Sequence, residues 1–170
     1  MTALPPLIVA AEDVGIRTSA AILITEDDRY LLQHRDNDPQ IFFPDMLCLF
    51  GGALEEGESP EAGLRRELRE ELELEAGGMR YFTRLAFDAI YADGGLCQRY
   101  YFEVPIKPGL MDSLVLREGA AMRLMTANDI AEESFRFVPY DLGILRMHML
   151  LWRKDGERLG GETGLSVAGS

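Results

Sequence analysis

The chain contains few of the residues that usually bind transition metals or form disulfide frameworks. Its 170 residues include two cysteines, Cys48 and Cys97, and two histidines, His34 and His148. The cysteines lack metal-ligand spacing, which indicates free thiols in a reducing compartment, and the cytoplasm is the expected location. Neither histidine is assigned a role, and His148 is expected to be a packed or partly exposed side chain on an apolar helix.

Positive charge is also scarce. Seventeen Lys and Arg residues stand against 29 Asp and Glu residues, which gives a net charge of −12. This charge would repel a nucleic-acid polymer, whereas a small anionic substrate would need a cation to bridge it to the protein. The sequence also lacks an apolar run that spans a bilayer and a basic start typical of a secretory signal, so we expect a soluble protein without a membrane partner.

Length and composition fit one compact domain, with 47% hydrophobic and 27% charged residues. We expect an N-terminal extension at residues 1–16, a single domain at residues 17–154 and a tail at residues 155–170. The tail is glycine-rich and polar, so any order there should come from packing on a neighbouring surface, such as that of a homodimer.

Short apolar segments separated by turn residues predict a sheet. Residues 18–25 and 30–33 flank a polar turn and should form a hairpin, and residues 79–88 and 96–104 should form a second. Further short strands are expected at residues 46–50, 114–116 and 122–125.

Helix signals occur at three places. Ser59-Pro60-Glu61 is a strong helix start, because it combines a capping serine, a first-turn proline and an acidic residue at the positive end of the helix dipole. Thr126 and Asp129 predict a capping box on a short helix. A longer helix should begin near Pro139 and bury a stripe at helical spacing: Leu142, Leu145, Met149 and Trp152. Strands on both sides of an acidic helix indicate an α/β fold, a mixed sandwich.

The segment at residues 55–75 has nine Glu and three Arg, a local net charge of −6. At about 100° per residue, a helical wheel gathers three leucines into a core-facing stripe: Leu64, Leu68 and Leu72. Glu67, Glu70 and Glu71 lie together along its border. Carboxylates at this spacing repel one another, so a compensating charge is expected.

A hard divalent cation such as Mg²⁺ would compensate this repulsion, because it prefers oxygen ligands and often shares its coordination sphere with phosphate. On the helix alone, the ordinary alternative is favoured: a solvated acidic face with a surface pair between Arg66 and Glu70. Gly51 and Gly52 shift the balance toward a site, since glycines between a strand and a helix let the backbone approach a ligand closely.

Together, residues 52–74 resemble the Nudix box, a pattern of glycine, five residues, glutamate, seven residues, then Arg-Glu-hydrophobic-any-Glu-Glu-any-Gly-hydrophobic. The matching residues are Gly52, Glu58, Arg66, Glu67, Leu68, Glu70, Glu71 and Leu74. One position departs, because Glu73 stands where the family usually has glycine. A glutamate adopts the left-handed conformation only at a cost, so the helix can instead continue to Gly77.

The resemblance implies a Nudix-like α/β/α sandwich with a mixed sheet. It also implies a pyrophosphohydrolase that uses Mg²⁺, with Mn²⁺ able to substitute, and in which a metal-activated water attacks phosphorus. The substrate would be a nucleoside diphosphate derivative: a nucleotide sugar, ADP-ribose, a dinucleoside polyphosphate or a nucleoside triphosphate. The alternative is a non-catalytic Nudix-fold module that binds a nucleotide, for which loss of box glutamates would be the signature. All of them are present.

The resemblance also assigns roles to residues. The metal ligands would be Gly51 through its carbonyl, Glu67, Glu70 and Glu71. Glu58 and Arg66 look like a brace between loop and helix, with an ordinary surface pair as an equal alternative. The general base would be Glu67 or Glu118, and the latter precedes Gly119 in a loop.

Two residues are candidates for substrate contact. Arg35, at the end of the second predicted strand, could meet a phosphate, although a solvent-exposed arginine is the commoner outcome. Tyr91, 17 residues beyond the box, resembles the pattern of dinucleoside polyphosphate hydrolases. ADP-ribose hydrolases tend to carry proline nearby, where this chain has Ala89.

The sequence therefore predicts that a metal binds among Glu67, Glu70 and Glu71. A crystal soaked in Mn²⁺ should show anomalous density within coordination distance of these carboxylates. Density elsewhere, with none beside them, would contradict the assignment.

Overall fold

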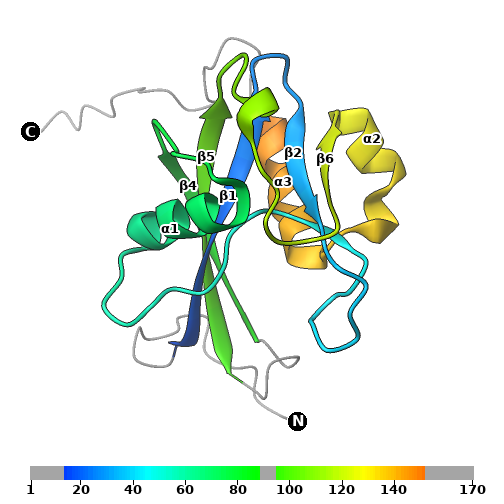
Figure 1. Ribbon diagram of the computed structural model, residues 1–170. Helices are drawn as coiled ribbons and strands as arrows, with labels where there is room; N and C mark the ends of the chain where they lie inside the picture. Colours follow the sequence, from blue (N-terminus) through cyan, green and yellow to red (C-terminus); the bar gives the residue numbers. More distant parts are fainter. Residues whose placement is uncertain (1–13, 89–94, 152–170) are drawn as a thin grey trace, which may run out of the picture.

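The computed structural model describes residues 14–88 and 95–151, in which a mixed sheet lies between helices (Figure 1). The strands are β1 (Val14–Thr25), β2 (Tyr30–His34), β3 (Leu47–Cys48), β4 (Arg80–Asp88), β5 (Leu96–Ile106) and β6 (Ala121–Met125). Their order is β3-β2-β1-β5-β4, with β6 also paired to β2. β1 runs parallel to β5, whereas the other pairs of strands are antiparallel. This arrangement is the expected mixed sheet.

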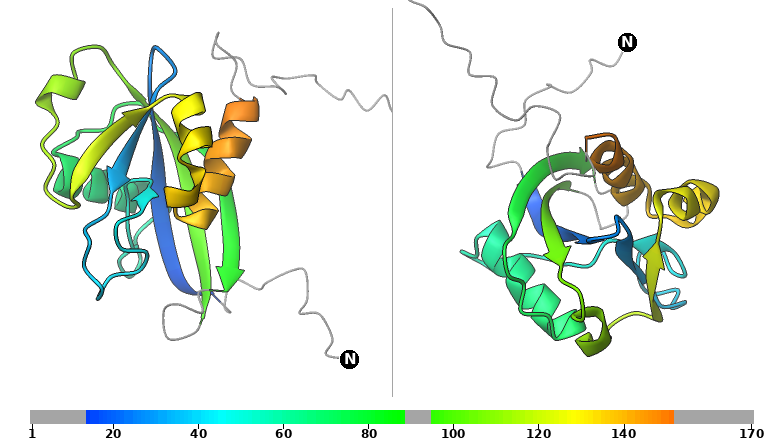
Figure 2. Two further views of the ribbon diagram at one scale, coloured as in Figure 1. Left: turned by 90° about the vertical axis from the view of Figure 1, so that its right-hand side faces the viewer. Right: turned by 90° about the horizontal axis from the view of Figure 1, so that it is seen from above.

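Helices cover both faces of the sheet (Figure 2). They are α1 (Pro60–Leu72), α2 (Ala127–Glu132) and α3 (Pro139–Leu151), with short 3₁₀ turns at Met111–Ser113 and Ser134–Arg136. β1 is buried on both sides, so its side chains alternate between two cores. One core joins Ala20, Ile22 and Ile24 to α2 and α3. The other joins Ala21 and Leu23 to the leucine stripe of α1. The α/β/α sandwich is thereby confirmed.

The strands of both predicted hairpins pair antiparallel, and both predicted caps form; residues 89–94, between the second pair of strands, lie outside the described residues. The hydroxyl of Ser59 accepts from the amide of Ala62 at 3.2 Å. Thr126 and Asp129 complete a reciprocal capping box. On α3, Leu142, Leu145 and Met149 pack into the core as expected. Trp152, Tyr91 and residues 155–170 lie outside the described residues.

The connection between β5 and β6 differs from expectation. Residues 114–116 were expected to be a strand but form a connection without strand structure. The amide of Val115 instead donates to the carbonyl of Leu72 at 3.1 Å, and that of Arg117 donates to the carbonyl of Glu71 at 2.8 Å. The backbone of this connection therefore satisfies the last carbonyls of α1, which would otherwise have no intrahelical partner.

The end of α1 also corrects an expectation. The helix does not continue to Gly77, because it ends at Leu72 and Glu73 takes the left-handed conformation with φ of 53°. The Glu73 amide still donates to the carbonyl of Arg69 at 3.0 Å. The Glu73 side chain forms an ion pair with Arg117, while the flanking Leu72 and Leu74 are buried in the core beneath α1. Glutamate thus occupies the capping position that glycine fills in the box pattern.

In the described part of the chain, no helix has the length and apolar character needed to cross a membrane. The longest helices have 13 residues.

This left-handed position predicts that Glu73→Gly stabilises the protein. Glycine relieves a backbone cost of about 1 kcal/mol, while the lost exposed ion pair is worth about 0.5 kcal/mol or less. The free energy of unfolding should rise by about 0.5 kcal/mol in denaturant titrations. Glu75→Gly is the matched control, because it also removes an exposed ion pair, to Arg69, but not at a left-handed residue. It should lower stability, and a decrease for both variants would contradict the account.

Candidate active site

The site is built around a short extended segment, residues 47–53, at the point where β1 and β2 separate. Leu47 and Cys48 pair with β2. Further along, the carbonyls of Phe50 and Gly52 accept from β1 amides at 2.9 Å. The opposite edge meets two carboxylates instead of a strand. Asp141 accepts from the amide of Leu49 at 3.0 Å.

The second of these edge contacts joins the segment to the acidic helix. Oε2 of Glu71 accepts from the amide of Gly51 at 2.9 Å. A β carbon on Gly51 would lie 2.3 Å from the carbonyl oxygen of Ser19. A β carbon on Gly52 would lie 2.6 Å from Oε2 of Glu67. Glycine is therefore required at position 51, where φ is 125° and the close neighbour is backbone, whereas a side chain at position 52 would displace the Glu67 carboxylate.

Glu71 is the buried member of the acidic group, with 4% of its surface exposed. Burial raises the pKa of Glu71 from its ordinary value of 4.5 to about 7, and the Gly51 amide opposes this. The negative charges of Glu118 and Glu67 raise this pKa further, whereas Arg99 lowers it. The ionised carboxylate is therefore held at a cost, as expected of a functional site.

Glu67 is half-buried beside the glycines. Burial raises its pKa, Arg66 lowers it, and the charges of Glu70 and Glu118 raise it. Glu118 thus lies within electrostatic reach of both Glu67 and Glu71, although it comes from the loop before β6. Glu70 is the exposed member, with 60% of its side chain accessible. The structure therefore brings the predicted carboxylates into one region.

Arg66 connects the loop before α1 to the helix. Its guanidinium lies 3.0 Å from Glu58, 2.8 Å from Glu67 and 3.2 Å from Glu70. It also donates to the carbonyl of Ala53 at 2.9 Å. The guanidinium holds the pKa of the Glu58 carboxyl below its usual range. This geometry resembles the expected brace, because Glu58 and Arg66 side chains are only 15% and 22% exposed.

The same contacts bear on metal binding. As their side chains stand, no three His, Cys, Asp or Glu residues of the described segments form a group that could hold a metal ion. Glu67 and Glu70 point to Arg66, and Glu71 points to the Gly51 amide. Their oxygen chemistry fits Mg²⁺, and burial, with a smaller contribution from neighbouring carboxylates, raises the pKa values of Glu67 and Glu71. Binding one ion together would require Glu67 and Glu70 to turn from Arg66.

Arg35 lies beside Glu118. Both line a small cavity of about 60 Å³, together with Gln33, Asp36, Ile41 and Gly119. The Arg35 guanidinium donates to the carbonyl of Phe42 at 2.9 Å. Arg35 and Glu118 are far apart in sequence, so the fold alone makes them neighbours.

An aromatic group near the site was missed from the sequence. Phe87 stacks on Tyr140 with ring centroids 4.7 Å apart, and Phe43 meets Tyr140 edge-on at 5.9 Å. Arg99 lies 5.7 Å from the centre of the Tyr140 ring and 3.2 Å from Asp141. These residues come from separate segments, and no local pattern joins them.

Two other regions are separate from this group. His148 is fully buried and lies 3.0 Å from the Tyr30 hydroxyl, as a packed residue of α3.

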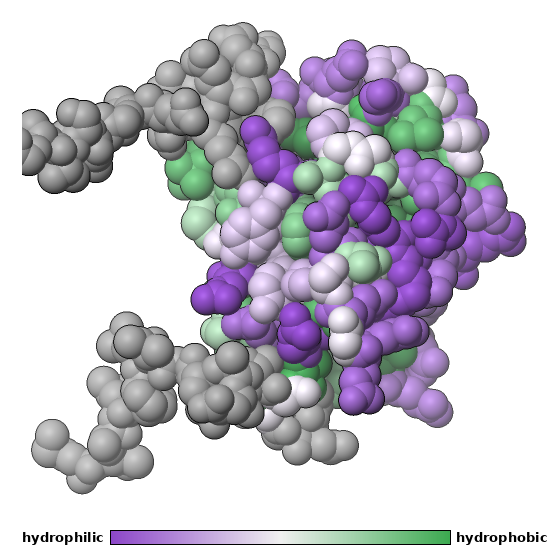
Figure 3. Space-filling model, turned by 90° about the vertical axis from the view of Figure 1, so that its left-hand side faces the viewer, coloured by the Kyte–Doolittle hydropathy of each residue, from purple (hydrophilic) through white to green (hydrophobic). Residues whose placement is uncertain are grey.

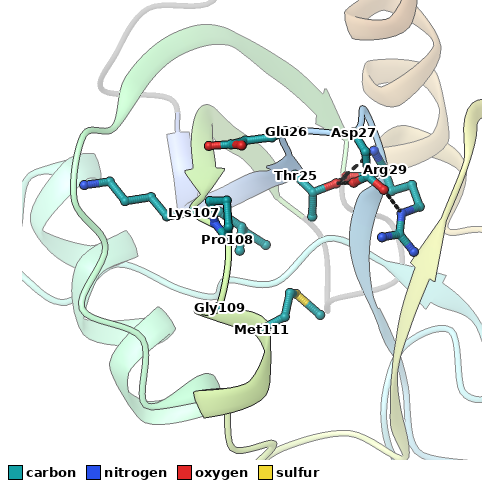
Figure 4. Close-up of a pocket in the computed structure, with 9 residues that line it drawn as sticks. Thr25, Glu26, Asp27, Arg29, Lys107, Pro108, Gly109 and Met111 are labelled. Carbon is teal, nitrogen blue, oxygen red and sulfur yellow. Dashed lines mark hydrogen bonds and ion pairs between the residues drawn. The ribbon is translucent and has the colours of Figure 1, made fainter.

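A larger cavity of about 340 Å³ lies between the β1–β2 turn and residues 106–111 (Figure 4). No described residue of the predicted site lines it. The surface over α1 is strongly hydrophilic (Figure 3), in keeping with its exposed acidic residues.

Comparison with known proteins identifies the family. The family model of the NUDIX domain matches residues 15–142, which is most of the chain. The chain therefore belongs to the Nudix family. Its acidic helix and glycine segment are the Nudix box of this domain.

Individual relatives are more distant. Nucleoside triphosphatase NudI from Escherichia coli is 46% identical over 56 residues, which cover 33% of this chain and 39% of that protein. The match thus spans less than half of the relative's length. The MutT protein of Methanosarcina mazei Go1 has a TM-score of 0.67 at 16% identity, covering 83% of this chain and 97% of that one. The NUDIX domain of Shewanella oneidensis NrtR, in complex with ADP ribose, has a TM-score of 0.62 at 17% identity, covering 79% and 86%. These two likenesses show the fold.

The buried carboxylate predicts a pH dependence in metal-free protein. The folded-state pKa of Glu71 is raised to about 7 from 4.5, so its contribution to stability is fully present below about pH 4.5 and is lost as pH rises through about 7. Glu71→Gln keeps an acceptor for the Gly51 amide but cannot ionise. Between pH 5 and pH 8, the free energy of unfolding of the parent protein should fall by on the order of 2 kcal/mol relative to that of this variant. Denaturant titrations at both pH values measure it, and parallel pH profiles would contradict it.

Proposed function

We propose that this protein is a Mg²⁺-dependent hydrolase that cleaves the diphosphate bond of a nucleoside diphosphate derivative. The observation that carries the proposal is the convergence of Glu67, Glu71 and Glu118 at the glycine segment of a Nudix domain. Two of these carboxylates have raised pKa values because they are buried near like charges. A divalent cation supplies the charge that such a group lacks.

The ligands of this ion would be Glu67, Glu70, Glu71 and the carbonyl of Gly51, and Mn²⁺ can replace Mg²⁺. When bound, the ion would supply Lewis acidity and lower the pKa of a water molecule. Gly52 leaves room for the Glu67 carboxylate next to the backbone. Arg66 and Glu58 hold the loop before α1 against the helix, which keeps the glycine segment in register with the carboxylates.

Glu118 is the favoured general base of the two candidates. Glu67 is engaged by Arg66, whereas Glu118 is exposed on a cavity that also contains Arg35. A carboxylate in this position can accept a proton from an attacking water. Arg35 would contact a phosphate oxygen from the other side of the cavity, as a guanidinium commonly does.

The aromatic group supports a nucleotide substrate. Phe43, Phe87 and Tyr140 are half-buried and present ring faces and edges near Arg99, whose charge also reaches Glu71. Flat aromatic surfaces with a few polar groups are typical of sites that bind a base. A panel of four compounds tests the substrate classes: ATP, UDP-glucose, ADP-ribose and diadenosine tetraphosphate, each with Mg²⁺ and with products identified by mass. Tyr91 keeps its predicted role in substrate contact as part of the proposal.

The second candidate function is a regulatory or binding module that recognises a nucleotide without cutting it. The NUDIX domain of NrtR, whose structure contains ADP ribose, gives this reading its support. The retained box glutamates favour the enzyme. Calorimetric binding of a panel compound without turnover, under saturating Mg²⁺, would select the module instead.

The cellular setting belongs to the same proposal. Cys48 and Cys97 are buried free thiols, which suit a reducing cytoplasm. A homodimer is proposed as the source of any order in residues 155–170, and light scattering tests it.

The proposal predicts that Glu70→Gln abolishes hydrolysis and leaves the fold intact. The amide nearly matches the carboxylate in volume but lacks its charge, so turnover should fall by about a hundredfold or more. The metal-free melting temperature should change little, because the exposed pair with Arg66 and the repulsion it offsets are each worth a few tenths of a kcal/mol. Glu61→Gln is the matched control, since Glu61 forms an exposed ion pair on the same helix, to Arg65 at 2.8 Å.

The control should retain the parent's rate. A Glu70→Gln protein that melts like the parent and keeps its rate within about threefold would remove Glu70 from the metal site.

A further inference from the structure

We propose that Gln33 is a positioning residue, whose buried side-chain amide holds the loop that carries Glu118. This inference rests on the proposed function and on Glu118 as its general base. Gln33 lies in β2 and is 3% exposed. Its Nε2 donates to the carbonyl of Glu118 at 3.2 Å, and its Oε1 accepts from the thiol of Cys48 at 3.3 Å.

Both polar atoms of the amide therefore have partners, and neither partner belongs to the backbone ladder of the sheet. β2 already pairs with β6 from Tyr30 to His34. The amide of Ala120 extends this pairing by donating to the carbonyl of His34 at 2.8 Å. The Gln33 side chain adds a further bond between β2 and this loop, to the carbonyl of Glu118, the candidate base.

The loop is shaped to fit this side chain. Gly119 has φ of 92°, and a β carbon there would lie 2.9 Å from Cγ of Gln33 and 3.0 Å from the carbonyl oxygen of His34. Any larger residue would therefore push the loop away from β2. Glycine at position 119 and glutamine at position 33 form one close contact.

The preceding residue is held from the opposite side. The amide of Arg117 donates to the carbonyl of Glu71 at 2.8 Å, at the end of α1. The backbone at Glu118 is thus fixed between β2 and the helix that carries the predicted metal ligands. Burying an amide costs free energy unless it is hydrogen-bonded, and an apolar residue would fill this strand position at no such cost. The geometry gives the amide a function in placing Glu118.

A double-mutant cycle tests the role. Gln33→Met keeps an unbranched side chain of similar length but removes both hydrogen bonds. With the panel compound that the parent hydrolyses fastest, kcat should fall about tenfold or more while KM stays within about twofold, because a displaced base affects the chemical step. In a Glu118→Gln background the same change should have no further effect beyond about twofold, since the residue being placed is gone.

Ser113→Ala is the matched control. It removes a hydrogen bond from a side chain to a backbone carbonyl, that of Leu110, in the same connection but away from Glu118. It should leave kcat within about twofold in both backgrounds. Gly119→Ala is the second test variant, made on the loop side, and it should repeat the loss of kcat and its absence in the Glu118→Gln background. It decides the question if Gln33→Met melts below the assay temperature.

The outcomes are separable. An equal loss of kcat on Gln33→Met in the parent and in the Glu118→Gln background would overturn the positioning role. So would a folded Gln33→Met protein that keeps the full kcat of the parent. A Glu118→Gln protein with the parent's rate would overturn it as well, while the hydrolase itself would stand. A parent that hydrolyses no panel compound would instead show failure of the proposed function.

Discussion

The structure depends on the hydrogen bonds that two backbone amides make where β1 and β2 separate. The segment at residues 47–53 fills this opening, and its free edge presents the amides of Leu49 and Gly51. A buried amide without a partner costs about 1–3 kcal/mol. Asp141 and Glu71 remove this cost, one from each helical layer. The segment thereby contacts both α1 and α3, which cover opposite faces of the sheet (Figure 2).

This solution places negative charge inside the protein. At the Leu49 amide, Arg99 and the Tyr101 hydroxyl both lie 3.2 Å from Asp141, so its charge is paired. At the Gly51 amide, Glu71 receives one hydrogen bond and has carboxylates as electrostatic neighbours. Asp141 is therefore a fully paired carboxylate, whereas Glu71 is the one that the proposed function assigns to the metal. A cation is more useful beside Glu71, because the protein itself leaves that charge incompletely balanced.

Local signals predicted much of the fold and the carboxylates that the fold brings into one region. Ser59-Pro60 and Thr126 with Asp129 begin helices because their partners lie within one turn. The spacing from Gly52 to Leu74 likewise predicted that the carboxylates lie together, because Glu67, Glu70 and Glu71 belong to one helix. The errors arose where distant contacts decide. Residues 114–116 bond to the end of α1 instead of a strand, and Arg117 pairs with left-handed Glu73. The aromatic group and the Gln33 contact likewise join segments that no sequence period relates.

The connection between β5 and β6 also couples its own detachment to fraying at the end of α1. Its amides at Val115 and Arg117 bond to the final carbonyls of α1. If this connection detaches from the domain, the last helical turn loses those bonds and can fray with it. That turn carries Glu71, so under the proposed function access to the cavity lined by Glu118 and retention of a cation on α1 would become parts of one fluctuation. In the proposed hydrolase, release of a charged product and loosening of the metal would then share a single barrier.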